Sequence, residues 1–152
     1  GFPTILNALA LANEVFAEQG ITVPDTELPD MDAEALMAMG RETMHKLHGD
    51  RAEGGYAAPD NKTTAAMYPT AVAYGYGELW NRPGLDYRQR MICAVAAFTA
   101  IDLLPQLTKF AQSALNTGLS REQVVEIIMQ TGPYSGFPRA LNALSAFGDA
   151  LG

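Results

Sequence analysis

The spacing of apolar side chains follows the period of an α-helix through most of the chain. Residues 31–48 place small and apolar residues on one stripe: Leu36, Gly40, Met44 and Leu47. Asp30 or Asp32 can cap that helix. Further helices are predicted over residues 63–80 and 87–104, from Pro105 to Gly118, after the capping box Ser120–Gln123, and from Pro138 onward. No strand-like alternation between hairpin turns occurs, so the pattern predicts an all-α helical bundle.

Glycine and proline mark the connections between these helices. Residues 49–61 read as a loop, Asn81–Gly84 as a turn, and residues 132–136 as a break before the last helix. Within 87–104, the stretch from Met91 to Phe98 is apolar on every side. A helix of this kind is typically buried, often between subunits.

An internal repeat divides the chain. Residues 1–9 reappear 135 positions later as residues 136–144, with seven of nine identities that include Gly-Phe-Pro. Residues 1–20 therefore resemble the last helix of a preceding copy of the same unit. Residues 21–30, rich in proline and aspartate, read as a linker. Residues 31–152 then form the domain proper.

Composition and charge exclude several classes of partner. The chain has 10 Lys and Arg against 17 Asp and Glu, a net charge of −7, which disfavours a nucleic-acid partner. The longest apolar run, Met91–Ala100, is far shorter than a membrane span, so no membrane partner is expected. The single cysteine, Cys93, excludes an internal disulfide and any CxxC motif. Without a basic leader at Gly1, a cytoplasmic location is expected.

Three ordered segments resemble the carboxymuconolactone decarboxylase family: Gly77–Arg90, Ala114–Glu126 and Tyr134–Leu144. The resemblance extends over roughly residues 40–144. It implies an all-helical fold of the alkylhydroperoxidase D-like type, self-assembly into homotrimers or hexamers, and no cofactor or metal. It also implies one of two chemistries, which are decarboxylation of a small cyclic carboxylic acid or reduction of peroxides by a pair of cysteines.

The peroxidase chemistry fails residue by residue. Counted back from Gly118, the resemblance places the two cysteines at Leu103 and Gln106, the histidine at Phe110 and the supporting acid at Met91. No thiolate and no base remain at these positions, so a thiol peroxidase is excluded. Cys93 lies in the apolar helix, where it is expected to be an inert packing residue.

Decarboxylation needs a cation for the carboxylate and a group that protonates the carbanion-like intermediate. Arg82 and Arg90 flank the predicted turn and are candidates for substrate binding, because a guanidinium binds a carboxylate through two parallel hydrogen bonds. Alternatively, one of them pairs with Glu78 or Asp86 and pins the turn. Glu78 is correspondingly either a general acid or base, or the partner of an arginine.

The remaining candidates also carry two interpretations each. His48 is a proton donor whose pKa a helix C-terminus would raise, or a surface cap of that helix. His45 shares its face, but no third ligand suggests a metal. Tyr134 lines a pocket or packs in the core with a satisfied hydroxyl. Trp80 is a packing anchor or a shelf for the substrate.

The alternative to a decarboxylase is a repurposed, non-catalytic binding protein. Met91, Leu103 and Phe110 replace polar positions of the family, so a persisting cavity would be apolar, with Gln106 as one polar tether. The two hypotheses differ in one structural requirement. A decarboxylase needs at least two titratable side chains that converge beside an arginine, whereas the binding protein needs only the apolar walls.

Overall fold

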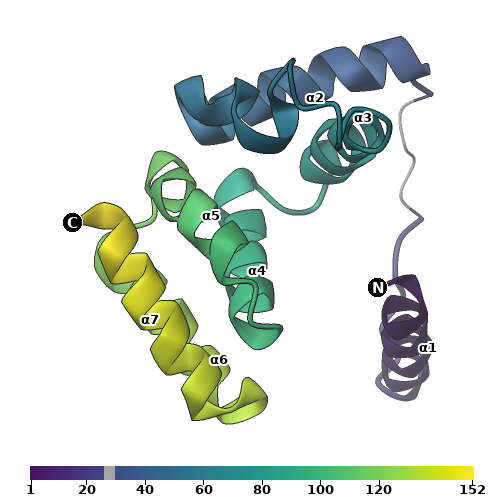
Figure 1. Cartoon of the computed structure of the whole chain (residues 1–152). Helices are drawn as coiled ribbons and strands as arrows, with labels where there is room; N and C mark the ends of the chain where they lie inside the picture. Colours follow the sequence, from purple (N-terminus) through teal and green to yellow (C-terminus); the bar gives the residue numbers. More distant parts are fainter. Residues whose placement is uncertain (26–29) are drawn as a thin grey trace.

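The computed structural model describes residues 1–25 and 30–152, and within these ranges every regular element is helical (Figure 1). The predicted all-α class is confirmed. The helices are α1 (Phe2–Glu18), α2 (Ala33–His48), α3 (Tyr68–Thr70), α4 (Tyr87–Ala100), α5 (Leu104–Asn116), α6 (Arg121–Ser135) and α7 (Phe137–Leu151). Short elements join them: the 3-10 turns η1 (Gly49–Glu53), η2 (Gly55–Ala57) and η4 (Leu79–Asn81), and the π-helical segment η3 (Ala71–Glu78).

Helices α4 to α7 pack against one another and enclose the main core. Its fully buried apolar side chains include Met91, Val95, Leu107, Val124 and Ile128. The starts of two of these helices follow directly from the sequence. Asp86 accepts from the Gln89 amide at the start of α4, and Ser120 accepts from the Gln123 amide at the start of α6, both within complete capping boxes.

A second layer, α2 with α3 and η3, lies across one end of this bundle (Figure 1). Helix α2 begins after Asp32, whose carboxylate accepts from the Ala35 amide at 2.8 Å. It crosses η3 so closely that neither helix has room for a side chain at the crossing: Gly40 abuts the Val72 carbonyl, and Gly77 abuts the Leu36 carbonyl. This contact positions the C-terminal end of α2 over the bundle.

Three predicted boundaries were wrong, each for a local reason. The helix predicted over 63–80 begins only at Tyr68, with Pro69 in its first turn, and continues as the π-helical η3. Helix α4 ends at Ala100 because Asp102 adopts a left-handed backbone, with φ of 61°. Helix α6 continues through Pro133 to Ser135 and ends at Gly136, whose φ of 97° suits glycine.

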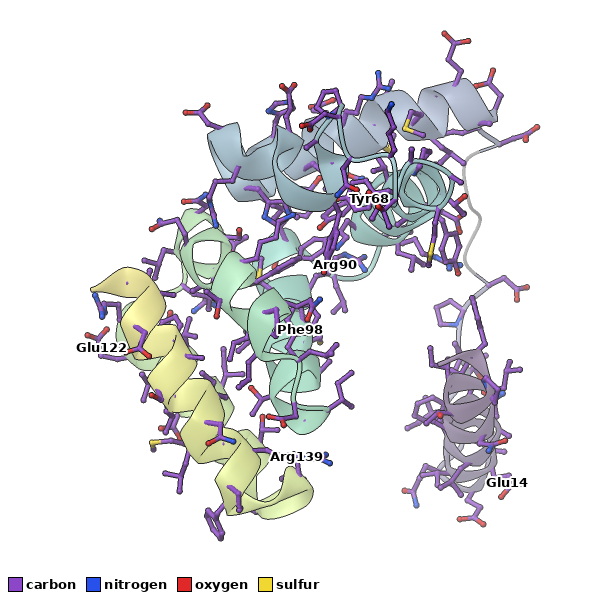
Figure 2. The ribbon with its side chains drawn as sticks, in the orientation of Figure 1. Glu14, Tyr68, Arg90, Phe98, Glu122 and Arg139 are labelled. Carbon is purple, nitrogen blue, oxygen red and sulfur yellow. The ribbon has the colours of Figure 1, made fainter. Side chains whose placement is uncertain are left out.

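Helix α1, on which Glu14 lies, is separated from the bundle of α4 to α7 (Figure 2). It buries none of its side chains. The sequence at its start matches the start of α7, yet α7 buries Ala140, Ala143 and Phe147. Part of the predicted linker, residues 26–29, lies outside the described residues. In the described ranges, no helix combines the length and the apolar character needed to cross a bilayer.

The repeat offers a matched pair of substitutions, because Leu9 of α1 and Leu144 of α7 are equivalent positions. Leu144 packs against the core, whereas Leu9 is more than half exposed. We expect Leu144→Ala to lower the free energy of unfolding by about 2 kcal/mol and Leu9→Ala to change it by less than about 0.5 kcal/mol. Urea unfolding of both variants measures the difference. Equal losses would show that α1 is packed in solution.

Candidate active site

The site forms around His48, the last residue of α2. Its side chain is only 2% exposed, so the interpretation of His48 as a surface cap was wrong. Its Nδ1 lies 2.7 Å from the Ser113 hydroxyl on α5, and its Nε2 lies 3.0 Å from the Tyr76 hydroxyl on η3. The Phe110 ring packs edge-on against the imidazole, with ring centroids 4.8 Å apart. The imidazole thus lies beside position 110, where the family resemblance expects a histidine.

Two cations lie next to this imidazole. The Arg51 guanidinium donates to the Lys109 carbonyl at 2.8 Å and to the Ser113 hydroxyl at 3.2 Å. Arg51 and Lys109 also line a hollow of about 480 Å³ together with Gly54, Gly55, Tyr56 and Asn61. We call it the Arg51–Lys109 hollow. Among the described residues, no carboxylate lies within 4.0 Å of either cation.

The hydrogen bonds of Ser113 assign the direction of the network. Ser113 is fully buried and its oxygen accepts from Arg51. The Ser113 O–H is therefore assigned as the donor of a hydrogen bond to His48 Nδ1, which accepts it. The imidazole proton then lies on Nε2 and is donated to the Tyr76 hydroxyl. The heavy-atom contacts thus assign a chain of hydrogen bonds in which each group donates to the next, from Arg51 through Ser113 and His48 to Tyr76.

Burial and charge hold these groups in defined protonation states. Burial, and to a smaller extent the charges of Lys109 and Arg51, together lower the pKa of His48 to about 4. Burial raises the pKa of Tyr76 above its ordinary value, so the phenol keeps its proton. Burial, and then the Arg51 charge, lowers the pKa of Lys109. At neutral pH the site therefore contains a neutral imidazole and a neutral phenol beside two cations.

The arginines predicted to hold substrate do not face one hollow. Arg82 lies 3.7 Å from Glu78, the pairing that pins the turn, and both line a hollow of about 180 Å³ under α2. Arg90 donates to the Arg82 carbonyl, and its buried Nε has no hydrogen-bond partner among residues 1–25 and 30–152. It borders a different hollow, of about 240 Å³, near the junction of the two layers (Figure 2).

The other predicted site residues are dispersed. Trp80 is half-buried against the core and shares the second hollow with Arg90. Tyr134 is 91% exposed on α6, so the interpretation that it packs in the core was wrong; it lines a hollow of about 610 Å³ between α4 and α6 instead. Met91 and Phe110 belong to the core, whereas Leu103 is exposed, and none of the hollows described is lined by all three. The Gln106 Oε1 is buried without a partner.

The structure also places Cys93 and the histidine pair, His45 and His48, that was considered for a metal. Cys93 is exposed on α4, because only one side of that helix faces the bundle, so its predicted burial was wrong. His45 is exposed and lies 3.6 Å from Glu53. Across the described ranges, no three histidine, cysteine or acidic side chains gather as a metal site would require.

Sequence reasoning missed Arg51, Tyr76, Lys109 and Ser113. Lys109 and Ser113 flank position 110 by one residue and by one helical turn on α5, so the family resemblance points at their neighbourhood. Arg51 gave no such signal, because residues 49–61 look like an ordinary loop. Only the packing of α2 over α5 brings His48 and Arg51 to this place.

Comparisons with known proteins agree with this architecture. The sequence profile of the carboxymuconolactone decarboxylase family matches residues 65–149, which include Tyr76, Lys109 and Ser113 but not His48 and Arg51.

Three curated relatives are similar to parts of the chain. A 4-carboxymuconolactone decarboxylase of Acinetobacter baylyi is 27% identical over 71 residues, which are 47% of this chain and 53% of the relative. A nitrosuccinic acid decarboxylase of Metarhizium robertsii is 25% identical over 71 residues, 47% of this chain and 50% of the relative. An uncharacterized 15.0 kDa protein of Paracoccus denitrificans is 32% identical over 91 residues, 56% of this chain and 68% of the relative.

The chain thus spans about half the length of the two named decarboxylases. The family profile covers more than half of this chain, and its matched region forms α3 to α7 of the observed fold. The chain therefore belongs to the carboxymuconolactone decarboxylase family.

Proposed function

We propose that the chain is a decarboxylase-like lyase that acts on a small cyclic carboxylic acid. The observation that carries the proposal is the buried His48, bonded to Ser113 and Tyr76, beside two cations without a carboxylate partner in the described part of the chain. Titratable groups thus converge beside an arginine, as a decarboxylase requires. The arginine is Arg51 rather than Arg82 or Arg90. The decarboxylase names of two relatives support the same reaction class.

In the proposed reaction, Arg51 and Lys109 bind the anionic substrate in their hollow. The bond between the carboxylate carbon and the substrate carbon breaks, CO₂ leaves, and the electron pair stays on the substrate carbon. The two cations stabilise this carbanion-like intermediate. A proton then adds to that carbon, so one proton is consumed for each CO₂ released. His48 is the proton store, and the hydroxyls of Ser113 and Tyr76 connect it to its surroundings.

Release of CO₂ from 4-carboxymuconolactone and from nitrosuccinate, the acids named by the relatives, tests the proposal. We expect release from at least one of them. Arg51→Gln should lower kcat/KM about 100-fold, because the substrate anion loses its guanidinium. His48→Gln should lower kcat about 100-fold or more, the usual contribution of a positioned acid or base. Steady-state kinetics at constant ionic strength separates the two effects.

Arg88→Gln is the matched control, because Arg88 is exposed in the first turn of α4 and lines none of the hollows described. It should leave the kinetics unchanged. Arg82→Ala tests the competing assignment. If Arg82→Ala abolished CO₂ release while Arg51→Gln did not, the substrate would belong beside Glu78 and the Arg51–Lys109 hollow would be the wrong site.

A second candidate function is a non-catalytic binding protein. It is favoured by a hollow of about 340 Å³ beside α2, whose walls are mostly apolar (Met37, Met44, Ala52, Tyr68 and Val72) but also include Arg41, His45 and Glu53. A ring-shaped apolar ligand suits such walls. Absence of CO₂ release from both acids, together with binding of apolar rings in this hollow, would favour this function over the lyase.

The proposal includes self-assembly into a trimer or hexamer. Several large apolar side chains stand exposed on α6 and α7, among them Met129, Tyr134, Phe137 and Leu141. Apolar patches on a protein surface often mark subunit contacts.

A further inference from the structure

The Arg51–Lys109 hollow holds two like charges next to a buried base. Arg51 is fixed there by hydrogen bonds to the Lys109 carbonyl and to Ser113, and Ser113 in turn contacts His48 Nδ1 at 2.7 Å. Like charges in one hollow repel each other, and an anion between them relieves that repulsion. The same two charges disfavour a proton on His48. An anion that neutralises them must therefore also change the affinity of His48 for a proton.

We propose that binding of an anion between Arg51 and Lys109 is coupled to proton uptake by His48. The inference rests on the anion site of the proposed function, but it does not require that the bound anion be decarboxylated. The anion is a small oxyanion of carboxylate type, because a guanidinium fork and an ammonium are suited to oxygen acceptors.

The titratable groups that face His48 come from each element packed against it. Arg51 lies on η1, Tyr76 on η3 and Lys109 on α5, while Phe110 and Ser113 contribute no charge. Asp50, in the same turn as Arg51, is exposed. The neutral phenol of Tyr76 can accept from Nε2 in both protonation states of the imidazole. The charges that an anion can offset at His48 are thus those of Arg51 and Lys109.

The protonated imidazole can be held without breaking the network. Both of its N–H groups would donate, one to Tyr76 as before and one to Ser113, whose oxygen has two lone pairs and already accepts from Arg51. The Ser113 hydroxyl then turns its proton away from Nδ1, so the 2.7 Å contact is kept with the opposite donor. Proton uptake therefore reverses one hydrogen bond and requires no movement of α2 or α5.

Coupling of this kind favours delivery of the proton that the proposed lyase needs. In the free site the imidazole is neutral, with a pKa of about 4, and is a poor proton donor. A rise of about one unit in this pKa on binding of the substrate anion would increase the protonated fraction of His48 in the complex about tenfold, where the carbanion needs a proton. By linkage, protonation of His48 strengthens anion binding by the same factor.

The test is an NMR titration of the two histidines, with sulfate as the probe and sodium chloride of equal ionic strength as the reference. We expect sulfate to raise the pKa of His48 by on the order of one unit. His45, exposed and paired with Glu53, is the internal control, and its titration should move much less. A sulfate effect that is equal for both histidines, or absent for His48, would overturn the inference.

Three variants sharpen the result. Lys109→Met and Arg51→Gln should each raise the pKa of His48 in chloride and reduce its response to sulfate, whereas Arg88→Gln should change neither. Because the wild-type titration decides alone, a variant that fails to fold leaves the inference testable. CO₂ release without a sulfate-dependent shift would overturn the coupling only. A shift without CO₂ release would overturn the decarboxylation only.

Discussion

Replacing Gly77 with alanine is expected to destabilise the protein by about 3 kcal/mol, although alanine is the better helix former. A Cβ atom on Gly77 would lie 2.2 Å from the Leu36 carbonyl oxygen and 3.1 Å from the Leu36 carbonyl carbon. Both atoms belong to the backbone of α2, so a rotamer change cannot relieve the overlap. The helix α2 or the segment η3 must move, and burial at their crossing is lost with that movement.

Gly75 provides the matched control within the same π-helical segment. A Cβ atom there meets nothing within 4 Å, and its backbone is not left-handed. We expect Gly75→Ala to be neutral or to stabilise by up to about 1 kcal/mol. Urea unfolding at pH 7 compares the two variants. If they had equal stability, the close crossing of α2 and η3 would not exist in solution.

The same substitution should disturb the site more than the core of the bundle. Tyr76 precedes Gly77 on η3, and His48 ends the helix that Gly77 contacts. Their 3.0 Å hydrogen bond therefore spans the two elements that the added methyl group forces apart. The close crossing of α2 and η3 therefore positions the His48 imidazole and the Tyr76 phenol relative to each other.

Local signals in the sequence were sufficient to predict the bundle. Capping boxes at Asp86 and Ser120 and the glycine at 118 mark helix ends through contacts between residues only a few positions apart. The stripe through Gly40 identified the buried face of α2, where Gly40 and Met44 are indeed buried. The π-helical form of η3 could not be predicted, because the spacing of apolar residues over so short a segment does not distinguish it from an α-helix.

The candidate site was predictable only in part, because its contacts join residues that are far apart in the sequence. His48 was identified as a candidate proton donor, but its burial depends on residues 28 and 65 positions away, Tyr76 and Ser113. Sequence spacing drew attention to the arginines of one turn, yet Arg82 pairs with its own helical neighbour Glu78. Arg51 received no attention, since its partners on α5 are about 60 positions distant.

Acidification should reveal His48 as a stability determinant. Its pKa is lowered from 6.5 to about 4 in the folded state, so the unfolded chain binds the proton more strongly. Stability from the neutral imidazole is then fully present above pH 6.5 and is lost as the pH falls toward 4. Between pH 7 and pH 5 the expected loss is about 2 kcal/mol, because most of that interval lies between the two pKa values.

A comparison with His48→Gln isolates this contribution. Glutamine does not titrate, so the variant should be less stable at pH 7 but should lack the 2 kcal/mol loss between pH 7 and pH 5. Urea unfolding at pH 7, 6 and 5 in chloride measures both profiles above the range in which most carboxylates titrate. Parallel profiles would mean that His48 is not buried as a neutral base. Sulfate should reduce the dependence of stability on pH in the wild type but not in His48→Gln. An anion beside Arg51 and Lys109 raises the affinity of folded His48 for a proton.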